Sequence, residues 1–443
     1  MEKKVIKEFY INGLYEERNV RIPFSSEYKI LVAENGYGKT TILNSFYALV
    51  SGDISKLRKV VFKSIGIVFD DGVDVSFEKS EFDADLEFIK GHHFFDHLES
   101  RLGEEFILQL IDEVRKAPAH RMEASPLFRH AISTLDIPPS MLRDYLKEFR
   151  TSRSNKEVNT ITQDKLDNIK KKFPYKTLHL PTYRRVEEDI RAYSGANDNS
   201  PFKHSSINFG MRDVQRNIDK ITSEILSSSV EWFSKINGQM LSQLVNGFSV
   251  TKEMKDSVTS PKAVEIVLER IGKNISPSHK DQILSLVNSG EILNGHDPLV
   301  YFVSNLLKVY EQQQENDNAI QSFTTVSNKY LADKEVVYDE SNVTIEIIRK
   351  KNSTVVDIEY LSSGEKQIIS LFALLYLQKK SDLAIFFDEP ELSLSMEWQK
   401  TLLPDIVRSG KCKFLFSTTH SPFIFENELE ENTVDLAEYI EEL

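Results

Sequence analysis

Three short segments, far apart in the chain, constrain its fold more than any other feature. Residues 33–41 read Ala-Glu-Asn-Gly-Tyr-Gly-Lys-Thr-Thr, residues 361–365 read Leu-Ser-Ser-Gly-Glu, and residues 386–390 read Phe-Phe-Asp-Glu-Pro. The first segment follows the apolar run at 30–32 and precedes a helix-like stretch, which is the order of strand, loop and helix that a phosphate-binding loop requires. The chain is therefore predicted to contain a mixed α/β domain that binds phosphate groups.

The first segment predicts a nucleotide-binding loop. Gly36 and Gly38 let backbone N–H groups converge on a phosphate at the start of a helix. Lys39 is placed to reach the terminal phosphates, and the Thr40 hydroxyl is placed to bind Mg²⁺. Ala33 stands where such loops usually have their first glycine, and its small side chain is expected to fit. The alternative is a glycine-rich turn that only opens a helix.

The second segment opens an apolar helix that is expected to run to Leu377, after strand-like runs at 343–348 and 355–358. Serine and glycine at a helix start can form a second anion site, because the first N–H groups of the helix are free. They are also the ordinary residues of a helix cap. Both interpretations stay open for Ser362 and Ser363.

The third segment ends an unbroken apolar run at 383–387, which predicts a strand buried on both faces. Asp388 and Glu389 follow at its carboxyl end, where α/β sheets carry their chemistry. Asp388 is expected to hold Mg²⁺ through water, and Glu389 is expected to be the general base that orients the attacking water. The strand predicted at 413–419 ends at His420, which could reach a γ-phosphate or be structural.

The types and order of these motifs resemble those of the ABC-type ATPases, which include chromosome-maintenance and double-strand-break-repair ATPases. In that family two nucleotide-binding domains enclose ATP, with the loop of one facing the signature of the other. The resemblance implies ATP and Mg²⁺ as cofactors, ATP hydrolysis to ADP and phosphate, and a homo-oligomer of at least two chains that is expected to be larger than a dimer. It also implies an α/β fold, an ABC-type P-loop ATPase domain split by a long, mainly helical insertion.

The resemblance also assigns roles to residues. It implies catalytic roles for Glu389, His420 and Lys39. It implies that Thr40 and Asp388 bind the metal ion. The residues implied in nucleotide binding are Asn35, Gly36, Tyr37, Gly38, Lys39, Thr40, Thr41, Ser362, Ser363, Gly364 and Glu365.

Several short stretches resemble a narrower group within this superfamily. Residues 388–394 and 419–422 resemble the bacterial antiphage-defence ATPases of the overcoming-lysogenization (OLD), Septu and PARIS systems, with the PARIS type nearest and the Septu type next. Stretches at 180–185 and 207–211 resemble the same group, and residues 182–185 are expected to cover the region that senses the γ-phosphate. Ser and Met at 395–396 depart from residues common in these relatives.

This narrower resemblance implies a sensor and scaffold. Such an ATPase holds a toxic nuclease inactive and releases it on recognising a phage-encoded protein. OLD-type relatives carry a nuclease domain after the ATPase, whereas 23 residues follow His420 here, so the effector is expected on a separate chain. It would be a Toprim nuclease in a PARIS-type system and an HNH nuclease in a Septu-type system. The alternatives are a DNA-repair ATPase that binds DNA directly and, less favoured, a subunit serving a membrane permease.

Charge and composition limit the partners. The net charge of −13 over 443 residues argues against non-specific coating of nucleic acid, so direct binding is left open but not favoured. Residues 143–185 hold twelve Lys or Arg against five Asp or Glu, which is either a track for an acidic partner or a solvated helical face. Residues 423–443 hold eight acidic and no basic residues, either a solubilising end or a docking strip.

The remaining features predict a cytoplasmic protein without a membrane span. No apolar run approaches 18 residues, and the N-terminus lacks a signal-like apolar region. The single cysteine, Cys412, rules out an internal disulfide and is expected to be buried.

Periodicity predicts the layout of the chain. The strands are expected as a hairpin at 9–15 and 20–24, a strand at 28–32, a second hairpin at 61–69 and 73–77, and a returning strand at 175–180, with a long amphipathic helix over 214–244. The domains are expected to be 1–80 (first half of the ATPase), 81–173 (helical insertion), 174–190 (core strand and loop), 191–332 (helical region) and 333–443 (second half with an acidic tail).

Overall fold

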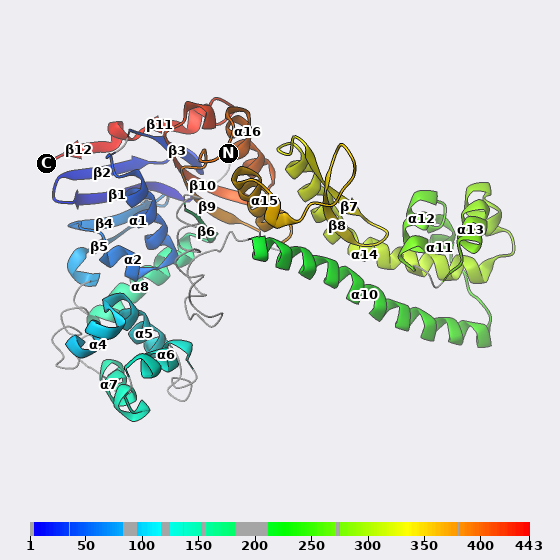
Figure 1. Ribbon diagram of the computed structural model, residues 1–443, viewed down its shortest axis with the longest axis horizontal. Coiled ribbons are helices and arrows are strands. Elements are labelled where there is room, and N and C mark those ends of the chain that lie inside the picture. The colour runs from blue at the N-terminus through cyan, green and yellow to red at the C-terminus, as the bar shows by residue number, and fades with distance from the viewer. Residues whose placement is uncertain are drawn as a thin grey trace. The chain divides into compact units, whose positions relative to one another are not determined.

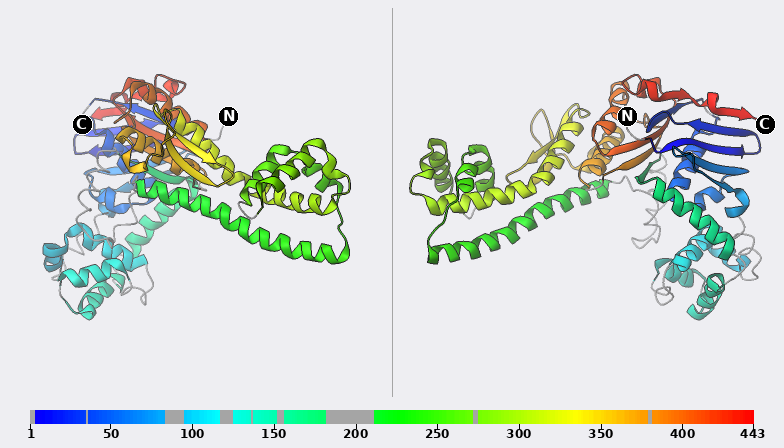
Figure 2. Two further views of the ribbon diagram at one scale, coloured as in Figure 1. Left: turned by 45° about the vertical axis from the view of Figure 1, so that its right-hand side comes forward. Right: turned by 180° about the vertical axis from the view of Figure 1, so that it is seen from behind.

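The chain divides into two compact parts. A first unit comprises residues 1–207 together with 381–443, and a second unit comprises residues 208–380. The computed structural model describes residues 4–34, 36–82, 95–116, 125–135, 137–151, 156–181, 211–271, 275–378 and 381–443. Figure 1 shows the elements of both units, and Figure 2 shows them from two further sides.

An antiparallel sheet forms one layer of the first unit, with strand order β12-β2-β1-β4-β5. Its strands are β1 (Ile6–Leu14), β2 (Arg18–Pro23), β4 (Ser64–Phe69), β5 (Asp74–Glu78) and β12 (Ile440–Glu442). Strands β1 and β2 form one hairpin and β4 and β5 form another. Both predicted hairpins are confirmed.

A parallel sheet forms the other layer, with strand order β11-β3-β10-β9-β6. Its strands are β3 (Tyr28–Val32), β6 (Lys176–Leu180), β9 (Leu383–Asp388), β10 (Cys412–Thr419) and β11 (Thr433–Asp435). Val32 pairs with Thr419, and Asp388 pairs with Thr418, so the carboxyl ends of β3, β9 and β10 meet at one edge. The three predicted segments around 28–32, 383–387 and 413–419 therefore converge.

Helix α1 (Lys39–Ser51) packs between the two sheets (Figure 1). The Phe46 ring stacks on Phe9 of β1 with centroids 4.4 Å apart. On its other side Phe46 meets the edges of Phe386 and Phe416, at 5.3 and 5.0 Å. All four rings are buried, so α1 is fixed to both layers, and the loop before it is anchored at both ends.

The predicted helical insertion of the first unit is confirmed. Its helices are α4 (Phe95–Leu102), α5 (Glu104–Lys116), α6 (Pro126–Leu135), α7 (Pro139–Thr151) and α8 (Lys156–Lys172), and the unit also contains α2 (Ile54–Arg58) and α16 (Met396–Arg408). Helices α4 to α7 share an apolar cluster of their own that includes Ile107 and Leu110. Lys165 and Lys172, from the basic stretch, form ion pairs with Glu81 and Asp71.

The second unit is built on two long helices that run side by side, α10 and α14 (Figures 1 and 2). Its elements are α10 (Met211–Asn246), α11 (Lys252–Ser257), α12 (Pro261–Arg270), α13 (Pro277–Ser289), α14 (Asp297–Asn328), the hairpin β7 (Lys334–Asp339) and β8 (Thr344–Arg349), and α15 (Ser363–Tyr376). The predicted helix over 214–244 is confirmed.

The strand expected at 355–358 is wrong. Val355 makes a single bridge to Ile348, and the chain then enters a short 3-10 turn at Ile358–Tyr360. The Asp357 side chain accepts a hydrogen bond from the Glu359 N–H, which stabilises the turn over a strand.

The acidic tail completes both sheets of the first unit. Strand β11 pairs with β3, and β12 pairs with β2. Cys412 is buried, as expected. Within the described residues, no helix combines the length and the apolar composition needed to cross a membrane. The α/β fold with inserted helical regions is confirmed, whereas the division into five predicted segments stays a prediction.

Candidate nucleotide site

The loop between β3 and α1 adopts the backbone that its glycines allow. Gly36 and Gly38 have φ angles of +93° and +82°, which disfavour residues with a Cβ. A Cβ at either position would meet no atom within 4 Å, so the need for glycine is conformational. Ala33 is not among the positive-φ residues and is 7% exposed, so alanine is accommodated. Asn35 lies outside the described residues.

The N-terminus of α1 is free to bind an anion. Gly38 occupies the cap position and has no side chain to bond the first N–H groups of the helix. The first turn holds no acidic residue. Tyr37 is exposed beside it, and the Thr41 hydroxyl lies 3.2 Å from the Tyr15 hydroxyl. A helix start without a side-chain cap and the positive end of the helix dipole together favour a phosphate here.

Lys39 points into the same region and is 5% exposed. Its Nζ donates to the carbonyl oxygens of Ala33 and Glu34, at 2.7 and 3.1 Å, and lies 2.6 Å from His420 Nε2. An ammonium group can only donate, so the ring nitrogen facing it accepts. Burial lowers the pKa of Lys39, although the charges of nearby carboxylates, Glu389 most strongly, act to raise it.

Asp388 lies at the end of β9 and is 2% exposed. Its two oxygens accept hydrogen bonds from different hydroxyl groups, Thr40 at 2.8 Å and Thr418 at 2.7 Å. The two predicted metal ligands, Thr40 and Asp388, are thus in direct contact. A hydroxyl and a carboxylate are the oxygen ligands that Mg²⁺ prefers, so this donor set fits the ion. The sequence analysis did not identify Thr418 as a site residue. Its pairing with Asp388 in the parallel sheet is the feature that places it in the site.

Glu389 occupies a strained backbone position next to His420. Its φ angle of +49° is unusual for a residue with a Cβ, and its N–H donates to the Thr418 carbonyl at 2.9 Å. Its Oε1 lies 3.5 Å from His420 Nε2. The three predicted catalytic residues, Lys39, Glu389 and His420, therefore lie together in the first unit.

Glu391 is a second site residue that sequence reasoning missed. Its Oε1 accepts a 2.7 Å hydrogen bond from the His420 backbone N–H, which holds the end of β10 in place. Its Oε2 is buried and has no hydrogen-bond partner among the described residues. Burial raises the pKa of Glu391, and the charge of Glu389 acts in the same direction. Nearby, Ser395 caps α16 by accepting from the Trp398 N–H.

The Leu-Ser-Ser-Gly-Glu segment lies in the second unit and begins α15. Ser362 is the cap residue, and its hydroxyl accepts from the Glu365 N–H while the Glu365 Oε2 accepts from the Ser362 N–H at 2.8 Å. Ser362 and Ser363 are exposed, whereas Gly364 and Glu365 are buried. Ser362 therefore caps α15, and its role in nucleotide binding stays a prediction.

Glu365 is held by a buried lysine that sequence reasoning missed. Lys334 Nζ lies 3.0 Å from Glu365 Oε1, and these side chains are 11% and 8% exposed. Although burial opposes it, the pKa of Lys334 is raised by its bonds to Asp333 and Glu365. The partners are 31 residues apart, so no local pattern links them.

Comparison with known proteins identifies the type of domain. The model of the family described as "AAA ATPase domain" matches residues 5–425 of this chain. No curated protein matches the chain.

Among solved structures, the chain is similar to the Smc head domain with an extended coiled coil, bound to the C-terminal domain of ScpA, from Pyrococcus furiosus. That match has 14% identity and a TM-score of 0.35, and covers 99% of this chain and 96% of that chain. An Smc head bound to the C-winged helix domain of ScpA matches with 12% identity and a TM-score of 0.34, covering 95% and 90%.

Proposed function

Because the chain belongs to the AAA ATPase domain family, we propose that it binds ATP with Mg²⁺ and hydrolyses it to ADP and phosphate. The observation that carries this proposal is the cluster at the carboxyl edge of the parallel sheet. A buried lysine, an open helix N-terminus, a hydroxyl and carboxylate pair, and a glutamate beside a histidine meet there. Each supplies one of the parts that phosphoryl transfer to water needs.

The residues divide the work of hydrolysis. The N–H groups of α1 and the Lys39 ammonium bind the phosphates, after Lys39 releases its contacts with Ala33 and Glu34. Thr40 and Asp388 would hold Mg²⁺, which would supply positive charge to neutralise the phosphates. The Glu389 carboxylate orients a water and accepts its proton as the water oxygen bonds to the γ-phosphorus and the bond to the β-phosphate oxygen breaks. His420 stabilises the γ-phosphate.

We further propose that the site is shared between two copies of the chain. Ser362 and Ser363 are exposed at a helix start, which supports a contact with a nucleotide held by the loop of a second copy. An exchange experiment tests this. Lys39→Ala and Ser363→Arg should each lose hydrolysis, and mixing them should restore roughly a quarter of wild-type turnover, because half of the dimers carry one intact composite site.

Two outcomes contradict these proposals separately. Turnover that survives Lys39→Ala contradicts the ATP site. Two inactive variants that stay inactive when mixed contradict sharing between copies. Light scattering of Glu389→Gln with ATP gives an independent measurement, since a variant that binds but does not hydrolyse ATP should accumulate as the dimer or a larger oligomer.

For the biological role, we propose a sensor and scaffold subunit of an antiphage defence system. The support is the resemblance of residues 388–394 and 419–422 to such ATPases. The partners would be a separate nuclease of the Toprim type and a phage-encoded trigger protein. Cells carrying the chain with its neighbouring genes should lose protection from phage with Lys39→Ala or Glu389→Gln. Normal protection in both strains would contradict this role.

The alternative is a repair ATPase that binds DNA directly, and the observation that favours it is a cationic end of α8. Lys170 and Lys171 are exposed in its last turn. If this alternative holds, DNA should stimulate ATP hydrolysis, and the stimulation should fall when Lys170 and Lys171 are neutralised. The affinity for DNA should decrease as the salt concentration rises. Unchanged hydrolysis with DNA at low salt would contradict it.

A further inference from the structure

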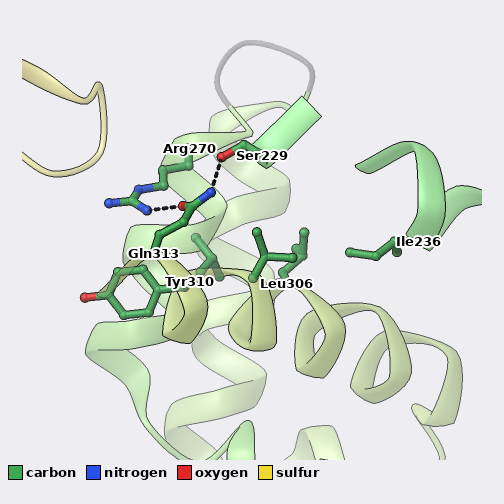
Figure 3. Close-up of a pocket in the computed structure, with 8 residues that line it drawn as sticks. Ser229, Ile236, Arg270, Leu306, Tyr310 and Gln313 are labelled. Carbon is green, nitrogen blue, oxygen red and sulfur yellow. Dashed lines mark hydrogen bonds between the residues drawn. The ribbon is translucent and has the colours of Figure 1, made fainter. Parts of the chain in front are cut away.

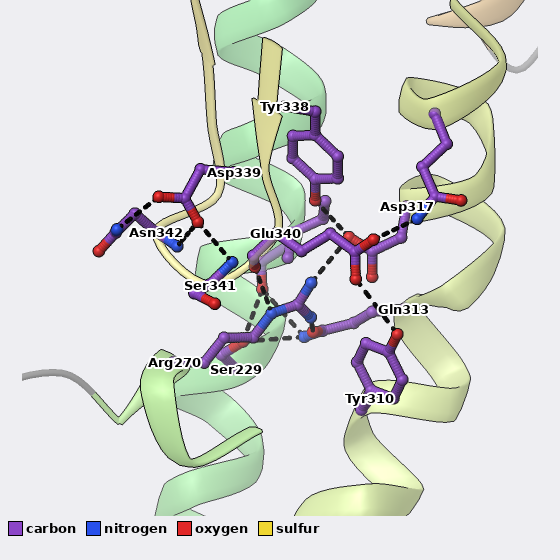
Figure 4. Close-up of polar contacts among 12 residues, drawn as sticks. Ser229, Arg270, Tyr310, Gln313, Asp317, Tyr338, Asp339, Glu340, Ser341 and Asn342 are labelled. Carbon is purple, nitrogen blue, oxygen red and sulfur yellow. Dashed lines mark hydrogen bonds and ion pairs between the residues drawn. The ribbon is translucent and has the colours of Figure 1, made fainter. Parts of the chain in front are cut away.

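Arg270, the last residue of α12, is the centre of a buried polar network in the second unit (Figure 4). Its guanidinium donates in three directions: to the Glu340 carbonyl at 2.9 Å, to Gln313 Oε1 at 2.7 Å and to Asp317 Oδ1 at 2.7 Å. Tyr338 donates its hydroxyl to the same Asp317 oxygen. We name these five residues, Arg270, Gln313, Asp317, Tyr338 and Glu340, the Arg270 node.

The Arg270 node connects the long helices with the hairpin. Gln313 lies on α14, and its Nε2 donates to the Ile225 carbonyl of α10 at 3.0 Å and to the Ser229 hydroxyl at 2.9 Å. Figure 3 shows this contact at a small pocket where α10, α12 and α14 meet. Tyr338 belongs to β7, and Glu340 follows it. The node thus holds three helices and one strand together.

The node is too buried to rearrange at low cost. The Arg270 and Asp317 side chains are 7% and 2% exposed. Asp317 Oδ2 has no hydrogen-bond partner among the described residues. The carboxylate is therefore stabilised by the hydrogen bonds that Oδ1 accepts from Arg270 and Tyr338. A guanidinium fork with fixed directions also sets the geometry of its three acceptors, which a lysine could not do.

Strand β7 links the node to the signature segment. Lys334 and Tyr338 are four residues apart, so they lie on the same face of the strand and roughly 13 Å apart. Between them, the Val336 N–H and carbonyl are both bonded by the Asn328 side chain of α14, at 2.7 and 2.9 Å. The strand is therefore attached at its start, its middle and its end.

The start of β7 reaches the signature directly. Lys334 pairs with Glu365, the residue that closes the cap of α15 through the Ser362 N–H. A displacement of Tyr338 along the strand direction therefore moves Lys334, and with it the first turn of α15. Helices α10, α12 and α14 meet at one end of this connection, and Ser362 and Ser363 lie at the other.

We propose that the Arg270 node is a positioning device that sets the placement of the signature segment through β7, so that a force or partner acting on α10 to α14 regulates hydrolysis. This regulation rests on the proposed shared ATP site. Arg270 and Tyr338 are positioning residues in it, since they act on Ser363 only through Lys334 and Glu365.

Tyr338→Phe tests the proposal with a minimal change, because it removes one hydroxyl and keeps the ring. Hydrogen exchange of the nucleotide-free protein should rise at amides 362–366 and not in α13, which is outside the connection. Turnover should fall about threefold to tenfold, the usual size of coupling through a packed network. Affinity for ATP should stay unchanged, because the phosphate-binding loop belongs to the first unit.

Tyr310→Phe is the matched control. Tyr310 lies under the Arg270 guanidinium, and its hydroxyl donates only a 3.4 Å bond to Glu340 Oε2, so the variant keeps Asp317 and β7 intact. It should match wild type in exchange and turnover. Arg270→Lys, which keeps the charge and loses the fork, should change both in the same direction as Tyr338→Phe.

The two readouts separate the proposals. Wild-type exchange at 362–366 in Tyr338→Phe overturns the positioning device, whatever the turnover. Raised exchange with unchanged turnover overturns the regulation of hydrolysis. If wild type hydrolyses no ATP, the proposed function fails, and the exchange measurement still decides whether the node positions the signature.

Discussion

Two helices of this protein begin with glycine-containing segments that read alike in the sequence and differ in structure. Helix α1 starts after Gly38, with no side-chain cap and no acidic residue in its first turn. Helix α15 starts after Ser362 and is closed by its own Glu365, which in turn is held by Lys334. The N-terminus of α1 has no side-chain cap. At the N-terminus of α15, the Ser362 hydroxyl accepts a hydrogen bond from the Glu365 N–H.

In the proposed shared site, this difference would give the two helix starts unequal tasks. An open N-terminus with a buried lysine beside it can bind a highly charged phosphate strongly. A capped N-terminus carries a carboxylate where an anion would compete, so it can contribute mainly through exposed hydroxyl and N–H groups such as those of Ser363. We expect the first unit to supply affinity for the nucleotide and the second unit to supply the correct placement of a neighbouring signature.

The largest expected effect comes from giving α1 the acidic residue that α15 has. Thr41 is the third residue of α1, as Glu365 is of α15, so Thr41→Glu places a carboxylate at the equivalent position. Two unit charges about 6 Å apart near a protein surface repel by about 3 kcal/mol, so affinity for ATP should fall roughly a hundredfold. Titration with a fluorescent ATP analogue measures it.

Thr41→Gln controls for size, since it has the same shape without the charge and also loses the contact with Tyr15. It should retain affinity within a few-fold of wild type. If Thr41→Gln and Thr41→Glu lose the same affinity for ATP, the loss comes from the contact with Tyr15, and the absence of an acidic residue in the first turn of α1 does not matter.

The next effect comes from removing the lysine that holds the α15 cap. Lys334→Met leaves Glu365 buried without its cation, which should lower the free energy of unfolding of the second unit by about 3 kcal/mol. Denaturation with urea measures the loss. Adding Glu365→Gln to Lys334→Met should recover most of it, because the uncompensated charge is gone.

Lys400→Met is the control for the loss of a lysine from an ion pair. Its pair with Glu426 is exposed, with side chains 43% and 61% accessible, so the loss should stay below about 1 kcal/mol. A similar cost for Lys334→Met and Lys400→Met would show that the cap of α15 does not depend on its buried partner.

These two helix starts also mark the limit of prediction from sequence. The open start was predictable, because the apolar run of β3, the glycines and Lys39 are contiguous. The apolar runs that end near Asp388 and His420 are local patterns too. The closed start was only half predictable. Ser362 and Glu365 form a recognisable capping pair, but Lys334 is 31 residues away and Arg270 meets Asp317 across 47 residues.

Short elements escaped prediction for a related reason. The tail strands β11 and β12 span three residues each, too few to show a period of two. The apolar residues at 355–358 did suggest a strand, yet the Asp357 side chain stabilises a turn instead. Residues 182–185 and 207–210, which carried part of the family resemblance, lie outside the described residues.

A smaller effect distinguishes the two starts by pH. Although burial opposes it, the pKa of Glu365 is lowered by hydrogen bonds from Ser362 and by Lys334. A carboxyl with a lowered folded pKa stabilises the fold above its ordinary pKa of 4.5, and that contribution is lost as pH falls through the folded value. Glu365→Gln should therefore be less stable than wild type at pH 7, with a difference that narrows below pH 4.5.

Glu391, beside the open start, should behave in the opposite way, because burial raises its pKa. A raised folded pKa favours folding below the ordinary value of 4.5, and that contribution is lost as pH rises through the folded value. The melting temperature of Glu391→Gln relative to wild type should therefore increase as pH rises from 4.5. A difference that is flat with pH would mean that Glu391 titrates as an exposed carboxyl, and the site would then lack the low-dielectric environment that strengthens the contact between Lys39 and its anion.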